Sequence, residues 1–137
     1  MTEFESKIVS IRRTPEDIFR VLSDFRLFTP FIPQDKLEGW EADEESCRFT
    51  VKGIGQTGLK IIEKEPHKTV KITGDGKLPF EFFLWVQLVE AAPYDTRMKL
   101  TLKADLNVML KMMLQKQLAE GIDAMAEQLA KAFNTGV

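Results

Sequence analysis

The sequence has little of the chemistry from which most metal and redox sites are built. Its 137 residues include one cysteine, Cys47, and one histidine, His67. A single cysteine excludes an internal disulfide, and one cysteine with one histidine cannot assemble a cysteine–histidine metal site. No residue pattern points to a site made of carboxylates alone. We therefore expect neither a metal nor a cofactor.

Long apolar runs and an excess of basic residues are also lacking. No window approaches the roughly 18 consecutive apolar residues of a transmembrane helix. The first ten residues are acidic where a signal peptide is basic, so we expect a cytoplasmic protein. The formal net charge of −2 argues against a nucleic-acid partner, because phosphate binding needs clustered Lys and Arg. Without a linker or repeat, residues 1–137 are expected to form a single domain.

A strong helical pattern runs from Asn107 to Asn134. Its apolar residues recur every three or four positions and so share one face of a helix. Asn107 is a suitable N-cap. We expect Lys116, Glu120 and Glu127 in water, opposite a buried stripe formed by Leu110, Leu114, Leu118, Ile122, Met125, Leu129 and Phe133.

The first turns of this helix are apolar on nearly every side. Four residues, Val108, Met109, Met112 and Met113, lie off the stripe or at its edges, and we call them the methionine collar. Methionine is flexible and suits adaptable binding surfaces, although methionines at helical spacing are more often core. Both interpretations stay open, as does a contact with a second copy or a protein partner.

The rest of the chain alternates in the manner of strands. A strand over 4–11 leads into Thr14-Pro15-Glu16-Asp17, which is typical of a helix start, and a second short helix spans 27–32. Six strands follow within residues 37–106. Short turns make the sheet antiparallel, and its apolar face needs a cover. We expect an α+β fold in which a curved sheet of about seven strands wraps around the C-terminal helix and leaves a cavity.

This order of elements resembles the SRPBCC (START-like, helix-grip) superfamily. The resemblance rests on Ile11-Arg12-Arg13-Thr14-Pro15-Glu16-Asp17-Ile18-Phe19-Arg20-Val21-Leu22-Ser23-Asp24 and on Tyr94-Asp95-Thr96-Arg97-Met98. It implies a helix-grip fold over the whole chain, in a branch similar to polyketide cyclases/dehydrases or lipid-transfer proteins. It says less about function, because this superfold hosts binding proteins and enzymes alike. The iron and Rieske signatures of its oxygenase branch are absent.

The function that we expect is binding of a small hydrophobic molecule, such as a lipid, quinone, polyketide or aromatic metabolite. The cavity should open between the methionine collar and an aromatic cluster from Phe25 to Phe31, with Met109 and Met113 as flexible lip residues. The predicted ligand-binding residues are Phe28, Phe31, Phe49, Val51, Leu59, Ile61, Phe82, Leu84, Met98, Leu100, Leu102, Met109, Leu110, Met113, Leu114 and Leu118.

Two other functions stay open. A pocket of fixed shape can guide a reactive chain without a catalytic triad, so a cyclase- or aromatase-type enzyme is one alternative. A regulatory protein, with a homodimer or partner contact through Trp85 or through Met109 and Met112, is the other. Alternation places both Trp40 and Trp85 on outer faces, unless a bulge shifts the phase of the strand. We predict no catalytic residue, because His67 has no evident carboxylate partner and an inward Cys47 resembles a small hydrophobe.

Overall fold

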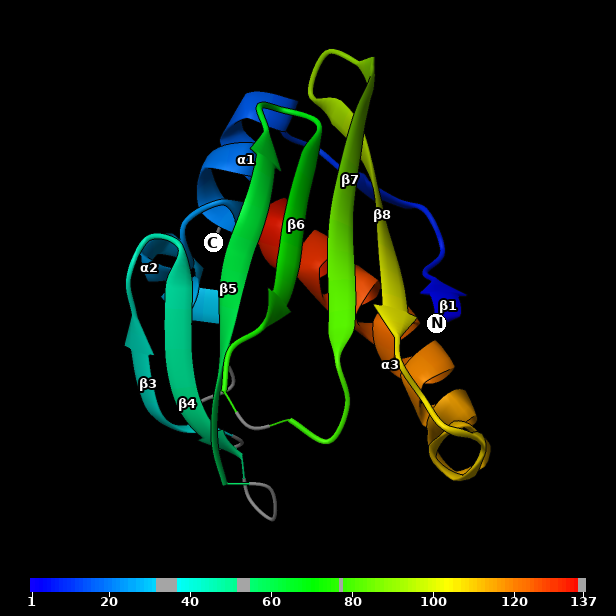
Figure 1. Ribbon diagram of the computed structural model, residues 1–137. Helices are drawn as coiled ribbons and strands as arrows, with labels where there is room; N and C mark the ends of the chain where they lie inside the picture. Colours follow the sequence, from blue (N-terminus) through cyan, green and yellow to red (C-terminus); the bar gives the residue numbers. More distant parts are fainter. Residues whose placement is uncertain (32–36, 52–54, 77, 136–137) are drawn as a thin grey trace.

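The computed structural model describes residues 1–31, 37–51, 55–76 and 78–135. Within these residues, one curved antiparallel sheet is covered on one face by a long C-terminal helix (Figure 1). The strands are β1 (Thr2–Glu5), β2 (Val9–Ile11), β3 (Leu37–Ala42), β4 (Ser46–Val51), β5 (Gly55–Glu65), β6 (Thr69–Gly74), β7 (Phe82–Ala92) and β8 (Asp95–Ala104). The helices are α1 (Pro15–Leu22), α2 (Phe25–Phe28), the 3-10 turn η1 (Thr29–Phe31) and α3 (Val108–Asn134).

The strands are ordered β1-β8-β7-β6-β5-β4-β3, and β2 also pairs with β8. From β3 to β8 every strand lies beside its neighbour in sequence, as short turns between antiparallel strands require. The predicted α+β helix-grip class is confirmed. The sheet has eight strands where about seven were expected.

The additional strand arises because the expected first strand is interrupted. Phe4 pairs with Leu102, whereas Val9 pairs with Met98, so the register against β8 shifts by one residue. At the break, the Ser6 hydroxyl accepts a hydrogen bond from the Leu100 amide at 2.8 Å. The Lys7 amide turns away from the sheet and donates to Asp123 of α3 at 2.7 Å. The sequence pattern did not show this bulge.

Strand β8 has the predicted alternation. Met98 and Leu100, expected inward, are fully buried, and Arg97 and Lys103, expected in water, are exposed. Leu102 and Lys99 are half-buried, and Thr101 on the outer side is buried. Strand β7 places Val86 opposite Leu100 in the same core. Because a one-residue slip would have reversed every side chain, these exposures fix the register of the sheet.

The predicted orientation of Trp40 is wrong. A bulge between Glu38 and Glu41, with Gly39 at φ +64°, reverses the alternation of β3. Trp40 therefore packs against the core, stacks on Phe49 with ring centroids 5.9 Å apart, and donates a hydrogen bond to Thr29 at 3.0 Å.

Trp85 lies on the outer face of the sheet, as expected, since its neighbours along β7, Leu84 and Val86, face the inner side. Its ring lies 4.9 Å from the Lys71 ammonium group and 5.4 Å from that of Lys103. These cation–π contacts cover part of an otherwise exposed aromatic surface.

Helix α1 begins at the predicted motif. The Thr14 hydroxyl accepts a hydrogen bond from the Asp17 amide, and Pro15 occupies the first turn, where its missing N–H is not needed. Ile18 and Leu22 are buried in the hydrophobic core. The next helix begins two residues earlier than expected, at Phe25, because Asp24 caps it.

Helix α3 is capped by Asn107, whose side chain accepts from the Leu110 amide at 2.8 Å. Lys116, Glu120 and Glu127 are exposed, as predicted. The burial of the predicted stripe is only partly correct, because Met125 is 47% exposed and Leu118 is half-buried. The buried face lies slightly to one side of the predicted stripe and consists of Ile122, Ala126, Leu129, Ala130 and Phe133.

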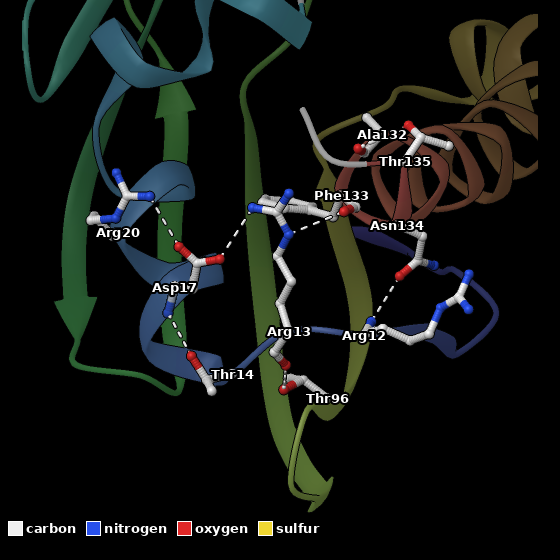
Figure 2. A network of polar contacts seen from close by, with 10 residues as sticks. All are labelled: Arg12, Arg13, Thr14, Asp17, Arg20, Thr96, Ala132, Phe133, Asn134 and Thr135. Carbon is white, nitrogen blue, oxygen red and sulfur yellow. Dashed lines mark hydrogen bonds and ion pairs between the residues drawn. The ribbon is translucent and has the colours of Figure 1, made fainter.

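A polar network fixes the C-terminal end of α3 to the segment that enters α1 (Figure 2). The Arg13 guanidinium donates to the Phe133 carbonyl at 3.0 Å and to Asp17 at 3.1 Å. The Arg12 amide donates to Asn134 at 2.7 Å. A cation beside the last carbonyl groups of a helix also interacts favourably with the helix dipole. We call this arrangement the C-terminal clamp.

The middle of α3 is held by a second contact with the N-terminal segment. Besides its amide bond to Asp123, Lys7 forms an ion pair with Glu127. These contacts and the clamp all involve the second half of α3. Its first half carries the exposed methionine collar and lies away from α1 and α2 (Figure 1). Within the described residues, no helix is long and apolar enough to cross a bilayer.

Candidate functional site

A cleft of about 560 Å³ lies between the sheet, the first two helices and the second half of α3. The floor comes from alternate residues of neighbouring strands, and one wall comes from the short helices. The other wall is a single face of α3, because its lining residues recur every three or four positions. The lining residues are Leu22, Phe25, Phe28, Pro30, Leu59, Ile72, Leu84, Val86, Leu100, Gly121, Ala124, Met125, Gln128, Leu129 and Ala132.

The cleft is open along α3. Gly121, Ala124, Met125 and Gln128 line it and are nevertheless exposed to solvent. An apolar surface of this kind is costly to leave in water, at roughly 25 cal/mol per Å². A hydrophobic molecule lying between α3 and the sheet would remove that cost.

Among the described residues, the lining carries one polar side chain, Gln128, and no ionisable one. None of these described lining side chains can act as a general acid or base, because that role needs a group that can exchange a proton. In the described part of the chain, no cluster of histidine, cysteine, aspartate and glutamate could hold a metal ion. What the cleft can do is exclude water from an apolar molecule and orient it.

Four of the predicted ligand-binding residues meet in this cleft: Phe28, Leu59, Leu84 and Leu100. They come from α2, β5, β7 and β8, so the predicted inward faces of these strands do converge. Their role as ligand contacts stays a prediction.

The other predicted residues lie elsewhere. Ile61 and Met98 are buried within the core, while Phe49, Leu102 and Leu118 pack at its margin. Phe82 lines a separate surface depression beside Phe80 and Phe83, and Leu110 and Leu114 are half-buried on the first half of α3. The side chains of Phe31 and Val51 fall outside the described residues.

The expected position of the opening is not where the cleft lies. Met109 and Met113 are 71% and 64% exposed and do not line the cleft. Met113 precedes Gly121, the first lining residue of α3, by about 12 Å at 1.5 Å per residue. The reason is that α1 and α2 lie beside the C-terminal end of α3, whereas the methionine collar is at the other end (Figure 1).

The α3 side of the cleft was missed by sequence reasoning. Gly121, Ala124, Gln128 and Ala132 are small or polar and contribute little to an apolar pattern. They recur every three or four positions, but a hydrophobic stripe is defined by large apolar side chains, which these residues lack. Ile72 and Val86 also line the cleft and are not among the predicted ligand-binding residues.

Neither Cys47 nor His67 lines the cleft, although Cys47 pairs across the strands with the lining residue Leu59. Cys47 is 2% exposed, and burial raises the pKa of its thiol to about 11, so it is protonated at neutral pH. His67 is exposed in the turn after β5, with φ +66°. Its ring packs edge-on against that of Phe19, with the ring centroids 5.6 Å apart.

Comparison with known protein families identifies the family of the chain. The model of the family described as "Polyketide cyclase / dehydrase and lipid transport" matches residues 1–134. The chain belongs to this family. No curated protein sequence matches it.

Solved structures share the fold of this polyketide cyclase and lipid-transport family member at low identity. The Aha1 dimer from Colwellia psychrerythraea is 18% identical, with 99% of this chain and 98% of that chain covered and a TM-score of 0.68. Norcoclaurine synthase from Thalictrum flavum is 15% identical, with 96% and 85% covered and a TM-score of 0.72. The di-domain ARO/CYC BexL from the BE-7585A biosynthetic pathway is 10% identical, with 96% and 46% covered and a TM-score of 0.76. At these identities the likeness establishes the fold alone.

Proposed function

We propose that this protein binds a small hydrophobic molecule in the cleft between α3 and the sheet. The observation that carries the proposal is a cleft of about 560 Å³ whose described lining residues include one polar side chain and no charged one. Its size falls within the range of roughly 300–1,000 Å³ that is usual for small-molecule sites. The family to which the chain belongs includes lipid transport in its description. A lipid, quinone, polyketide or aromatic metabolite has the required apolar surface.

The test is titration with Nile red, an uncharged apolar fluorophore, at neutral pH. Phe28→Asp places a carboxylate in the cleft lining and should weaken binding at least tenfold. Met113→Lys is the matched control, because Met113 is exposed outside the cleft, and it should leave binding unchanged. Thermal melting must show both variants folded. Equal effects of the two changes, or binding only by partly unfolded protein, would refute the site.

The natural ligand can be sought directly. Delipidated protein is incubated with cell extract, repurified and examined by native mass spectrometry. A retained small molecule that Phe28→Asp does not retain would identify the ligand class. Retention by both proteins would place the ligand outside the cleft.

A cyclase- or aromatase-type enzyme is the second candidate. The family description names cyclases and dehydrases, and BexL, an ARO/CYC protein, has the same fold. In such a mechanism the cleft would hold a reactive chain in one folded shape, and the rate would come from proximity and orientation. Conversion of a bound polyketide to a cyclised product, lost in Phe28→Asp, would favour this candidate over simple binding.

A contact with a second copy or another protein is the third candidate. The observation that favours it is the methionine collar, whose four side chains are 64–81% exposed; Trp85 on the outer sheet face is the other candidate contact. Sedimentation velocity over a concentration series tests self-association. Met112→Lys should abolish a dimer formed through the collar, and Trp85→Ala one formed through the sheet. The cytoplasmic location expected from the sequence stays a prediction, which cell fractionation would test.

A further inference from the structure

Gln128, the one polar side chain among the described lining residues, lies in the middle of the α3 wall of the cleft. The residues one turn before and one turn after it on the same face are Ala124 and Ala132, which also line the cleft. Neither is large enough to cover the Gln128 amide. Within the described residues, no hydrogen bond engages that amide, which leaves one acceptor and two donor hydrogens available to a molecule in the cleft.

Filling the cleft would change the surroundings of this amide. In the open cleft Gln128 is exposed, so water satisfies its hydrogen bonds. An apolar molecule between α3 and the sheet would displace that water. A ligand without a hydrogen-bonding group would leave the amide partly unpaired, which is unfavourable in an apolar setting. A ligand with an oxygen atom at this place would replace the lost water.

The lining also limits the charge that a bound ligand can carry. A carboxylate or phosphate buried in the cleft would need a cation or several N–H donors close by. In the part of the chain that the structure describes, the lining contains no lysine, arginine or histidine, and the strands and short helices contribute only apolar side chains to it. An anionic head group would therefore have to stay outside, in water.

We propose that Gln128 selects an uncharged ligand whose apolar body carries one carbonyl or hydroxyl oxygen. The amide NH₂ donates to a carbonyl, and the amide oxygen accepts from a hydroxyl, so either group fits. Ketones, quinones, phenols and alcohols belong to this class; plain hydrocarbons and fatty-acid anions do not. The inference rests on the proposed function, because it assumes that a ligand occupies this cleft.

The test uses three probes with one ring system: naphthalene, 1-naphthol and 1-naphthoate, each titrated by displacement of Nile red at neutral pH. Wild-type protein should bind 1-naphthol most tightly, naphthalene less tightly and 1-naphthoate least. In Gln128→Leu, which keeps the size but removes the hydrogen bonds, affinity for 1-naphthol should fall about 2- to 12-fold, as expected for one lost hydrogen bond. Affinity for naphthalene should stay the same or rise.

Gln115→Leu is the matched control, because Gln115 is exposed on the first half of α3 and does not line the cleft. It should alter none of the three affinities. Equal losses for naphthol and naphthalene in Gln128→Leu would show that Gln128 only packs against the ligand and would overturn its selective role. Tightest wild-type binding of 1-naphthoate would overturn the proposed ligand class. Failure of wild-type protein to bind any probe would overturn the proposed function itself, together with this inference.

Discussion

Gly121 offers a way to separate the stability of α3 from the space in the cleft. It lies inside α3 and lines the cleft, and a Cβ atom built there would meet nothing within 4 Å. Glycine within a helix costs about 1 kcal/mol relative to alanine. Since no clash offsets this gain, Gly121→Ala should raise the free energy of unfolding by about 1 kcal/mol. For a chain of this size that corresponds to about 3–5 °C in Tm.

A larger side chain at the same position should close part of the cleft. Leucine has nearly the helix propensity of alanine, so Gly121→Leu should also fold well. Its side chain would occupy space that about three methylene groups of a ligand could fill, each worth about 0.8 kcal/mol. Affinity for an apolar ligand should therefore fall by about 2–3 kcal/mol, roughly 30- to 150-fold.

The assay combines urea unfolding with Nile red titration of wild type, Gly121→Ala and Gly121→Leu. Ala119→Leu adds the same side chain at an exposed position of α3 that does not line the cleft, and it should leave affinity unchanged. If Gly121→Leu binds the probe as tightly as wild type, the ligand does not occupy this cleft. If Gly121→Ala lowers stability, the open space beside Gly121 is not present in solution.

Four further outcomes follow from the packing. Ile122→Ala should destabilise the protein by about 2–5 kcal/mol in urea unfolding, because it leaves a cavity in the core; a loss below about 0.5 kcal/mol would contradict its burial. Thr57→Val should raise stability by about 1 kcal/mol, since the Thr57 hydroxyl, in a residue only 5% exposed, is the one buried side-chain polar atom of the described residues without a partner. Cys47 should react with a thiol reagent far more slowly in native than in urea-unfolded protein, since burial raises its pKa to about 11. Hydrogen bonding, chiefly from Arg20, lowers the pKa of Asp17, so its contribution to stability is full above the unfolded value of about 3.9 and is lost as pH falls below it; Asp17→Asn should flatten the acid side of the stability profile.

The elements that the sequence predicted well are those whose pattern and surroundings agree. Strand β8 has one face in the core and one toward solvent, so the alternation of its residues was enough to place Met98 inside and Lys103 outside. The start of α1 was equally clear, because Thr14 and Pro15 act within the first turn. Local signals of this kind do not depend on what packs against them.

The errors come from features that a periodic pattern does not record. Trp40 faces inward because of a bulge at Gly39, and a glycine inside a short strand does not reveal whether it bends the chain. The buried face of α3 differs from the predicted stripe because the N-terminal segment binds Asp123 and Glu127 and so orients the helix. Such contacts join distant parts of the chain and leave no periodic trace.

The cleft was harder to predict than the fold for a related reason. Its α3 wall depends on what is absent: Gly121 and Ala124 create space by being small, and hydrophobic patterns record only large side chains. Nothing in the sequence pattern distinguishes Gln128 from an ordinary solvent-facing residue of the helix. Only the position of α3 against the sheet shows that these residues face apolar side chains across the cleft.

The contacts that hold α3 also determine the order in which the molecule can fold. The hydrogen bond from Lys7 to Asp123 joins residues 116 positions apart, and the one from Arg12 to Asn134 joins residues 122 apart. Strands β3 to β8, by contrast, pair with sequence neighbours and close only short loops. During synthesis the sheet therefore has its partners before the 27 residues of α3 exist, and its apolar inner face stays uncovered until they arrive. The last helix is thus the step that converts an aggregation-prone sheet into a protected one, and a chain that ends before Val108 should need a chaperone or precipitate.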